Sequence, residues 1–293
     1  MKITDYFNQE GPFLSFEVFP PKTDARYEDV KKSILDIAEL KPAFESVTYG
    51  AGGGTSSYTL GIAKNIKSKN VPTIAHLTCV SSSKETVQQR IKELIDADIK
   101  NVFALRGDLT PELENSDRST WDYRYATDLV KELKAANPDF CIGGACYPEI
   151  HPESTNQHED IMHLKEKVDA GCSFLTTQMF FDNNLFYNFL YKIREAGITV
   201  PVIPGIMPIT MGRQLERALK LSGSFVPQRF KSLVDKFGDN PDAMKQAGIA
   251  YATDQIIDLY ANGIKLVHVY SMNKPDVAAN IQANLSNIIK KPY

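Results

Sequence analysis

The sequence predicts an α/β fold, specifically a (β/α)8 TIM-type barrel, on three observations. Eight short β-rich runs alternate with amphipathic helical segments along the chain. Most successive runs begin roughly thirty residues apart, which is the length of one βα unit. The 293 residues suit one barrel with modest insertions, since a barrel typically needs ~250 residues. We therefore expect a single domain over residues 1–293, with an open doubly wound sheet as the alternative because strand count does not prove closure.

The predicted strands are residues 14–19, 46–49, 73–78, 101–105, 141–146, 174–178, 202–205 and 266–270. The segments between them carry apolar residues at helical spacing. Ser82 and Glu85 form a candidate capping box before the helix that follows the third strand. Gly171 and Gly197 are predicted to end two later helices, because glycine readily adopts the left-handed conformation of a C-terminal cap.

Two stretches break this regular spacing. Residues 111–121 are polar and contain proline, asparagine and serine, which favours an active-site loop. Residues 222–247 are predicted to form extra helices between the seventh and eighth strands. That segment is too short to enclose a hydrophobic core of its own, so we expect it to pack on the barrel.

Composition and residue spacing exclude several classes of protein. The 33 basic and 36 acidic residues give a net charge of −3, without the basic surface expected of a nucleic-acid or membrane-binding protein. No stretch approaches the ~18 apolar residues of a membrane span, and no signal peptide is visible. The four cysteines lack CxxC spacing and are predicted to be free thiols of a cytoplasmic protein. Histidines without HxH or HExxH spacing predict no metal site.

Glu17 is the first candidate for chemistry. It lies in the first predicted strand on the same face as Ser15, between Phe16 and Val18 in sequence. Burial of a carboxylate raises its pKa toward the range of a general acid. The alternative is a structural glutamate paired with a lysine or arginine of the core.

The fourth predicted strand ends in Arg106, Gly107 and Asp108. Gly107 would allow a ligand to approach the backbone closely, with opposite charges on either side. The alternative is a structural ion pair. Arg-Gly-Asp also occurs in adhesion ligands, which would make the chain an extracellular binding module. The absence of an export signal and the position after an apolar strand argue against that second class.

Other strand ends give weaker signals. Backbone amides of the segment TYGAGGGT (48–55) could cradle a phosphate, although Thr55 replaces the last glycine of a dinucleotide fingerprint. A flexible βα turn is the simpler interpretation of this loop. His76 near the end of the third strand is more simply a hydrogen-bonded structural residue. Gln178 ends the sixth predicted strand.

Taken together, these strand ends resemble the methylenetetrahydrofolate reductase family, FAD-containing barrels of one-carbon metabolism. The resemblance covers nearly the whole chain in order. The matching stretches are SFEVFPP (15–21), VTYGA (47–51), HLTC (76–79), ALRGD (104–108), YPEIHPE (147–153), KVDAG (167–171), QMFFD (178–182) and IPGI (203–206).

The resemblance implies catalytic roles for Glu17 and Asp108, which would also contact substrate. It implies an FAD site formed by Thr48, His76, Arg106, Gly107, Asp108, Tyr125, Ala126, Ala145, Tyr147, His151, Asp160 and Lys167. It implies that folate or the nicotinamide donor is held by Gln178, Gln214, Tyr270 and Lys274. In this scheme Lys167 neutralises the pyrophosphate, and Asp108 tunes the flavin potential and contacts the pterin.

The resemblance also implies a ping-pong reaction. NADH or NADPH reduces FAD, and 5,10-methylenetetrahydrofolate then accepts the hydride to give 5-methyltetrahydrofolate, a step of methionine biosynthesis. Homo-oligomers are typical of the family. The choice between NADH and NADPH stays open because no ribose-reading residue is identifiable. A rival hypothesis is a cofactor-free barrel lyase or transferase acting on a pterin or a phosphorylated substrate.

The chain departs from the family pattern at three places. Residues 56–58 (SSY) stand where charged residues are usual. Ala218 and Leu219 stand where an aromatic lid can stack on the ligand. Lys274 stands where arginine can occur, so the folate glutamate tail would lack a bidentate partner.

Overall fold

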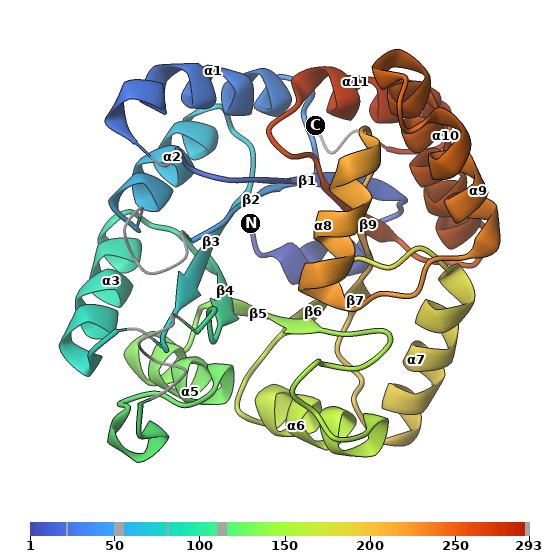
Figure 1. Cartoon of the computed structure of the whole chain (residues 1–293). Coiled ribbons are helices and arrows are strands. Elements are labelled where there is room, and N and C mark those ends of the chain that lie inside the picture. The colour runs from blue at the N-terminus through green and yellow to red at the C-terminus, as the bar shows by residue number, and fades with distance from the viewer. Residues whose placement is uncertain (22, 50–55, 81, 110–115, 291–293) are drawn as a thin grey trace.

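The computed structural model describes residues 1–21, 23–49, 56–80, 82–109 and 116–290. Within these ranges nine parallel strands form a nearly closed barrel with the order β7-β6-β5-β4-β3-β2-β1-β9-β8 (Figure 1). The strands are β1 (Phe13–Val18), β2 (Glu45–Val47), β3 (Thr73–Thr78), β4 (Asn101–Leu105), β5 (Cys141–Cys146), β6 (Phe174–Thr177), β7 (Val202–Ile203), β8 (Gly205–Ile206) and β9 (Leu266–Tyr270). The predicted barrel is confirmed. The glycine-rich segment 50–55 and the first part of the predicted loop 111–121 lie outside the described residues.

The predicted seventh strand is divided into two at Pro204. β7 pairs with β6, whereas β8 pairs with β9, so the segment 202–206 joins the two edges of the sheet. Proline has no N–H to donate to a ladder, and its carbonyl accepts instead from His268 N at 3.0 Å. One chain segment thus completes the ring of strands. The structure has nine strands where eight were predicted because Pro204 divides this segment into β7 and β8.

The larger helices surround the strands, with α8 nearer to the centre than the others in the view of Figure 1. They are α1 (Tyr27–Ala38), α2 (Ser56–Ser68), α3 (Lys84–Asp96), α5 (Ala126–Ala136), α6 (Gln157–Asp169), α7 (Asn183–Glu195), α8 (Gly212–Ser222), α9 (Gln228–Phe237), α10 (Pro241–Ala261) and α11 (Pro275–Asn284). Short 3-10 helices are η1 (Ile3–Asn8), η2 (Asp24–Arg26) and η4 (Arg118–Thr120). No helix in the described ranges is long and apolar enough to cross a membrane.

The predicted helix ends are partly correct. Gly171 and Gly197 follow α6 and α7 with φ of 121° and 79°, as expected for residues that close a helix. The predicted capping box at Ser82 and Glu85 is wrong by one residue, because Ser83 is the N-cap of α3 and its side chain accepts from Thr86 N. Ser82 precedes the cap, so its hydroxyl cannot serve that first turn.

An apolar cluster closes the amino end of the barrel. The interior near the strand amino ends is filled by large side chains such as Phe13, Phe44 and Phe174, and η1 packs Ile3 and Tyr6 into the same cluster. Chemistry is therefore left to the opposite, carboxyl end of the strands.

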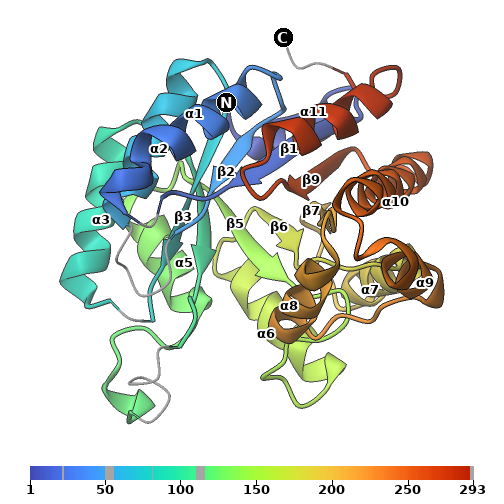
Figure 2. The ribbon, with the colours of Figure 1, turned by 45° about the horizontal axis from the view of Figure 1, so that its top comes forward.

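The predicted extra helices between the seventh and eighth strands are present as α9 and the first turns of α10. Figure 2 shows α9 next to α10 at the edge of the barrel, with α8 nearer to its centre. Their apolar side chains, including Phe230 and Met244, form a separate cluster with Met179 and Phe181, which follow β6. The insertion therefore packs on residues of the barrel rather than on a core of its own.

Candidate active site

Glu17 lies near the carboxyl end of β1, in register with Ser46 of β2 and Tyr270 of β9. Its side chain is 24% exposed. Desolvation by burial raises the pKa of Glu17 from 4.5 to about 8, which confirms the expected effect of its position. No nearby carboxylate contributes to this shift among the described residues, and Asp108 is exposed. At neutral pH Glu17 holds a proton.

His76 is the nearest titratable partner of Glu17, with 3.9 Å between Nε2 and Oε2. Burial lowers the pKa of His76 to about 3, so its imidazole is neutral at physiological pH. A neutral imidazole beside a protonated carboxyl is not an ion pair. Among the described residues no lysine or arginine is ion-paired with Glu17, which leaves the structural-pair alternative without support.

His268 is a buried residue of this region that sequence reasoning missed. Its Nδ1 and Nε2 each lie 2.8 Å from a serine hydroxyl, those of Ser15 and Ser46. Ser15 donates to Val267 O at 3.0 Å, so it accepts from Nδ1–H, while Nε2 accepts from Ser46. Burial lowers the pKa of His268 to about 3. The layer beneath Glu17 is therefore neutral and supplies no cation that would draw off its proton.

Tyr270 forms the wall next to Glu17. Its hydroxyl donates to Thr177 O, and burial, followed by the nearby Glu17, raises its pKa well above the usual value. A Cβ at position 205 would lie 2.3 Å from the Tyr270 hydroxyl and 2.5 Å from Thr177 O. Gly205 is thus required for this ring to reach across the barrel, which explains the glycine of the IPGI stretch.

Arg106 and Gly107 follow β4 at the rim. Arg106 donates from both terminal nitrogens to the two carboxylate oxygens of Glu153 at 2.6 Å, a bidentate pair that raises the pKa of Arg106. Gly107 has φ of 93°, and a Cβ there would lie 3.0 Å from Thr78 Cβ. The arginine of the Arg-Gly-Asp tripeptide is 20% exposed and occupied by Glu153. The adhesion alternative therefore has no support in the geometry.

The loop after β5 gathers three more predicted flavin residues. Tyr147 and His151 meet edge to face with ring centroids 4.6 Å apart. Asp160 accepts from His151 N and from Ser154 Oγ, each at 3.2 Å, which fixes the loop over the start of α6. Burial raises the pKa of Tyr147 and lowers that of His151. Both rings are thus neutral, and they lie at a steep angle to one another near Arg106.

Lys167 of α6 reaches back to the same strand. Its ammonium donates to Ala145 O at 2.8 Å, and its chain passes over Gly144, where a Cβ would lie 2.9 Å from Lys167 Cδ. Burial lowers the pKa of Lys167, with Asp160 and two thiols acting in the other direction. Among the residues that the structure describes, no carboxylate is ion-paired with this ammonium. An anion at the end of β5 would supply the missing counter-charge.

The remaining predicted flavin residues lie along the neighbouring strand ends. Thr48 follows β2, with its N–H donating to Val18 O at 3.0 Å. Tyr125 is the N-cap residue of α5 and is 60% exposed, and Ala126 begins that helix. Asp108 is exposed two residues beyond Arg106. These residues thus follow β2 and β4 or lie at the start of α5.

The predicted substrate residues lie on the opposite side. Lys274 donates to Thr210 Oγ1 at 2.7 Å, and Thr210 N donates to Gln214 Oε1 at 3.1 Å. Thr210, which the sequence reasoning missed, thus links two predicted residues that are sixty positions apart. Gln178 accepts from Met179 N at 2.9 Å, which orients its amide after β6. Ala218, at the position where the family can have an aromatic lid, is buried and 2% exposed.

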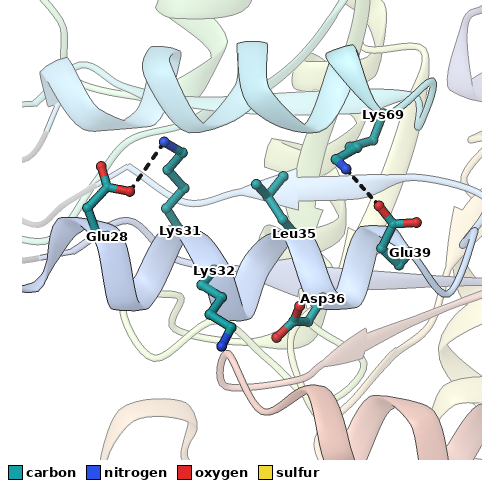
Figure 3. Close-up of a pocket in the computed structure, with 7 residues that line it drawn as sticks. All are labelled: Glu28, Lys31, Lys32, Leu35, Asp36, Glu39 and Lys69. Atoms are coloured by element: carbon teal, nitrogen blue, oxygen red, sulfur yellow. Dashed lines mark hydrogen bonds and ion pairs between the residues drawn. The ribbon is translucent and has the colours of Figure 1, made fainter.

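A shallow surface groove lies elsewhere, on the outer helices. It is lined by Glu28, Lys31, Lys32, Leu35, Asp36, Glu39 and Lys69 (Figure 3). Its charges neutralise one another, with Lys31 3.4 Å from Glu28 and Lys69 2.8 Å from Glu39. Because this groove lies on α1 and just after α2, it is separate from the carboxyl ends of the strands.

A ring of parallel strands with a protonated acid, a guanidinium and a partly buried lysine near its carboxyl ends defines a β/α-barrel protein with a candidate ligand site at that end. The sequence identifies the family more closely. Residues 2–286 match methylenetetrahydrofolate reductase, and the chain belongs to that family.

Curated relatives agree with this assignment. The chain is 35% identical over 266 residues to 5,10-methylenetetrahydrofolate reductase of Pectobacterium carotovorum, covering 90% of this chain and 87% of the relative. It is 34% identical to the enzyme of the same name from Escherichia coli, covering 90% and 88%. Methylenetetrahydrofolate reductase 1 of Schizosaccharomyces pombe is 37% identical over 93% of this chain but only 46% of the relative. The chain thus spans about half of that longer protein.

Solved structures support the fold independently. A Clostridium thermocellum protein described as binding two copies of 5-methyl-5,6,7,8-tetrahydrofolic acid aligns with a TM-score of 0.68 and 15% identity, over 98% of this chain and 99% of that chain. At this identity the likeness establishes the barrel fold alone.

Proposed function

We propose that the protein reduces 5,10-methylenetetrahydrofolate to 5-methyltetrahydrofolate, using FAD and a nicotinamide donor in a ping-pong sequence. Membership of the methylenetetrahydrofolate reductase family supports the folate reaction. The observation that carries the proposal is Glu17, an acid that keeps its proton at neutral pH at the carboxyl end of a barrel. A relative from Zea mays is named as an NADH enzyme, which favours a nicotinamide donor.

The residues present fit FAD. Lys167 is a partly buried ammonium that donates only to a carbonyl in the described contacts, so a pyrophosphate would find a fixed cation there. Arg106, Tyr147 and His151 would line the flavin, and the positive φ of Gly107 allows a close backbone approach. When bound, FAD would supply a carrier that accepts hydride from NAD(P)H and delivers it to the folate.

Glu17 would perform the proton transfer. Its carboxyl would give a proton to N10 of the substrate while the C–N10 bond of the five-membered ring breaks, which leaves an iminium at N5. That iminium accepts hydride and becomes the N5-methyl group. The neutral His76 and His268 keep the region free of cations that would ionise Glu17 beforehand. Because Glu17 is 24% exposed, water can return the proton after each cycle.

Gln178, Gln214, Tyr270 and Lys274 would hold the folate or the nicotinamide on the other side of the mouth. The bonds from Lys274 through Thr210 to Gln214 would keep two of these side chains in place. The proposal includes a single catalytic domain and a homo-oligomeric, cytoplasmic protein of methionine biosynthesis.

The test begins with an absorption spectrum of the purified protein. We expect flavin bands, or their appearance with tight binding when FAD is added to the apoprotein. Anaerobic addition of NADH or NADPH in separate experiments should bleach those bands and identify the donor. Protein that carries no flavin and binds none would contradict the proposal and favour the cofactor-free lyase or transferase.

A further inference from the structure

The turn after β9 lies beside the end of β1 and holds it by two side chains. The register of these two strands ends with the pair Glu17 and Tyr270. Beyond that pair, Ser271 Oγ donates to Glu17 O at 2.7 Å. Asn273 Nδ2 donates to Phe19 O at 2.8 Å, and Asn273 Oδ1 accepts from Phe19 N at 2.9 Å. Side chains therefore continue the contact between the two strands where backbone pairing stops.

Two buried prolines explain why side chains are needed here. Pro20 and Pro21 follow Phe19, and proline has no N–H with which to extend a ladder. The N–H and the carbonyl of Phe19 are thus the last complete pair of backbone groups at this end of β1. An asparagine amide carries both a donor and an acceptor, so one side chain can bind both groups. Asn273 therefore does what a paired strand residue would do.

The backbone of the turn favours asparagine at this position. Lys274 N donates to Ser271 O at 3.1 Å, and the central residues Met272 and Asn273 have φ of 55° and 53°. Positive φ at both central positions is the pattern of a type I′ turn, which glycine and asparagine favour and bulky residues rarely adopt. Met272 is 39% exposed, so burial of its side chain does little to fix the turn. The bonds of Asn273 fix the turn against β1.

These contacts bear directly on the acid of the site. Ser271 holds the carbonyl of Glu17 itself, and Asn273 holds the residue two positions further on. The Glu17 side chain leaves from the Cα next to that carbonyl, so a shift of this backbone would move the carboxyl with it. Lys274 is held separately, by its bond to Thr210 Oγ1. Loss of the Asn273 amide would therefore release the acid more than the lysine.

We propose that Asn273 is a positioning residue for the folate half-reaction, which holds the Glu17 carboxyl in place by clamping the backbone of Phe19 to the turn after β9. This inference rests on the proposed function, in which Glu17 gives its proton to N10. A proton donor must lie within hydrogen-bond reach of its acceptor, and a misplacement of ~1 Å can cost about 100-fold in rate. Releasing the clamp should slow the step that uses this proton and leave hydride transfer to FAD unchanged.

The test is Asn273→Gly in the FAD-loaded protein, followed by anaerobic stopped flow. Glycine adopts positive φ readily, so this variant keeps the turn and loses the amide. We expect reoxidation by saturating methylenetetrahydrofolate to slow about 10- to 100-fold. Flavin reduction by NAD(P)H, and the folate concentration that gives half the limiting rate, should be nearly unchanged. Asn70→Gly is the matched control, because Asn70 is an exposed asparagine after α2 with φ of 62°. It should leave both half-reactions unchanged.

A double variant separates positioning from a general structural role. Glu17→Gln with Asn273→Gly should be reoxidised no more slowly than Glu17→Gln alone, because Asn273 acts through the carboxyl that is already lost. Ser271→Ala removes the other contact and should also slow reoxidation selectively. If Asn273→Gly does not fold, a normal reoxidation rate in Ser271→Ala would overturn the inference.

Three other results would overturn the inference and leave the proposed function intact. They are a normal reoxidation rate in Asn273→Gly, equal slowing of both half-reactions, and an effect that adds to that of Glu17→Gln. A wild-type protein whose reduced flavin is not reoxidised by methylenetetrahydrofolate would instead overturn the proposed function, and this inference with it.

Discussion

Replacing Glu17 with glutamine should make the stability of the protein less dependent on pH. The pKa of Glu17 is raised from 4.5 to about 8, so the folded protein keeps a proton that the unfolded chain releases between these values. Stability contributed by this group is therefore fully present below pH ~4.5 and is lost as pH rises toward 8. The amide of Glu17→Gln does not titrate, so the variant escapes this loss.

The size of the effect follows from the shift. Each pKa unit corresponds to about 1.4 kcal/mol. The free energy of unfolding of the variant, relative to that of the wild type, should therefore rise by at most about 5 kcal/mol between pH 4.5 and pH 8 and stay constant above pH 8. Urea unfolding of both proteins at several pH values measures this difference. Glu153→Gln is a control of opposite sign, because its bond to Arg106 lowers the pKa of Glu153 and stabilises the protein at neutral pH. Parallel curves for Glu17→Gln and wild type between pH 5 and pH 9 would refute a protonated Glu17.

Three further variants test other parts of the site. Lys167→Ala should weaken FAD binding about 10- to 100-fold in a fluorescence titration, because a charged hydrogen bond is lost. Lys165→Ala in the same helix should leave FAD binding unchanged. Normal FAD affinity in Lys167→Ala would show that Lys167 is not part of the site. Asp108→Asn should raise the flavin reduction potential and change both half-reactions, because a negative charge beside the ring is lost; an unchanged potential and turnover would place Asp108 elsewhere. Gly205→Ala should destabilise the protein by about 1–3 kcal/mol or more in thermal unfolding, since its Cβ would overlap a tyrosine hydroxyl and a carbonyl oxygen. Gly61→Ala, where the nearest contact is 3.5 Å, should be neutral or stabilising, and equal effects of the two would contradict the packing at Gly205.

Much of the fold was predictable because buried parallel strands appear in sequence as short apolar runs. The bounds of β3, β4, β5 and β9 agree with the predicted ranges. The division at Pro204 was not predicted, since the run 202–205 is apolar on both sides of the proline and only tertiary pairing shows that its halves join different neighbours.

The environment of a candidate residue could be predicted where the residue lies near the end of a strand. It could not be predicted where the residue's hydrogen-bond partners are distant in sequence. Position and flanking residues sufficed to expect a raised pKa for Glu17. The contacts of His268 with Ser15 and Ser46 span more than two hundred residues, so no local pattern reports them. One signal was available: His268 lies two positions before Tyr270, and alternation in a strand places both on the same face.

The most direct test of the account separates the two half-reactions by anaerobic stopped flow. The FAD-loaded wild type should be reduced by NADH or NADPH and then reoxidised by methylenetetrahydrofolate. Glu17→Gln should be reduced at a nearly normal rate, but its reoxidation by folate should slow by about 10²- to 10⁴-fold, because the leaving N10 receives no proton. Reoxidation of Glu17→Gln at the wild-type rate, or an equal loss of both half-reactions, would contradict the role of Glu17 as the acid.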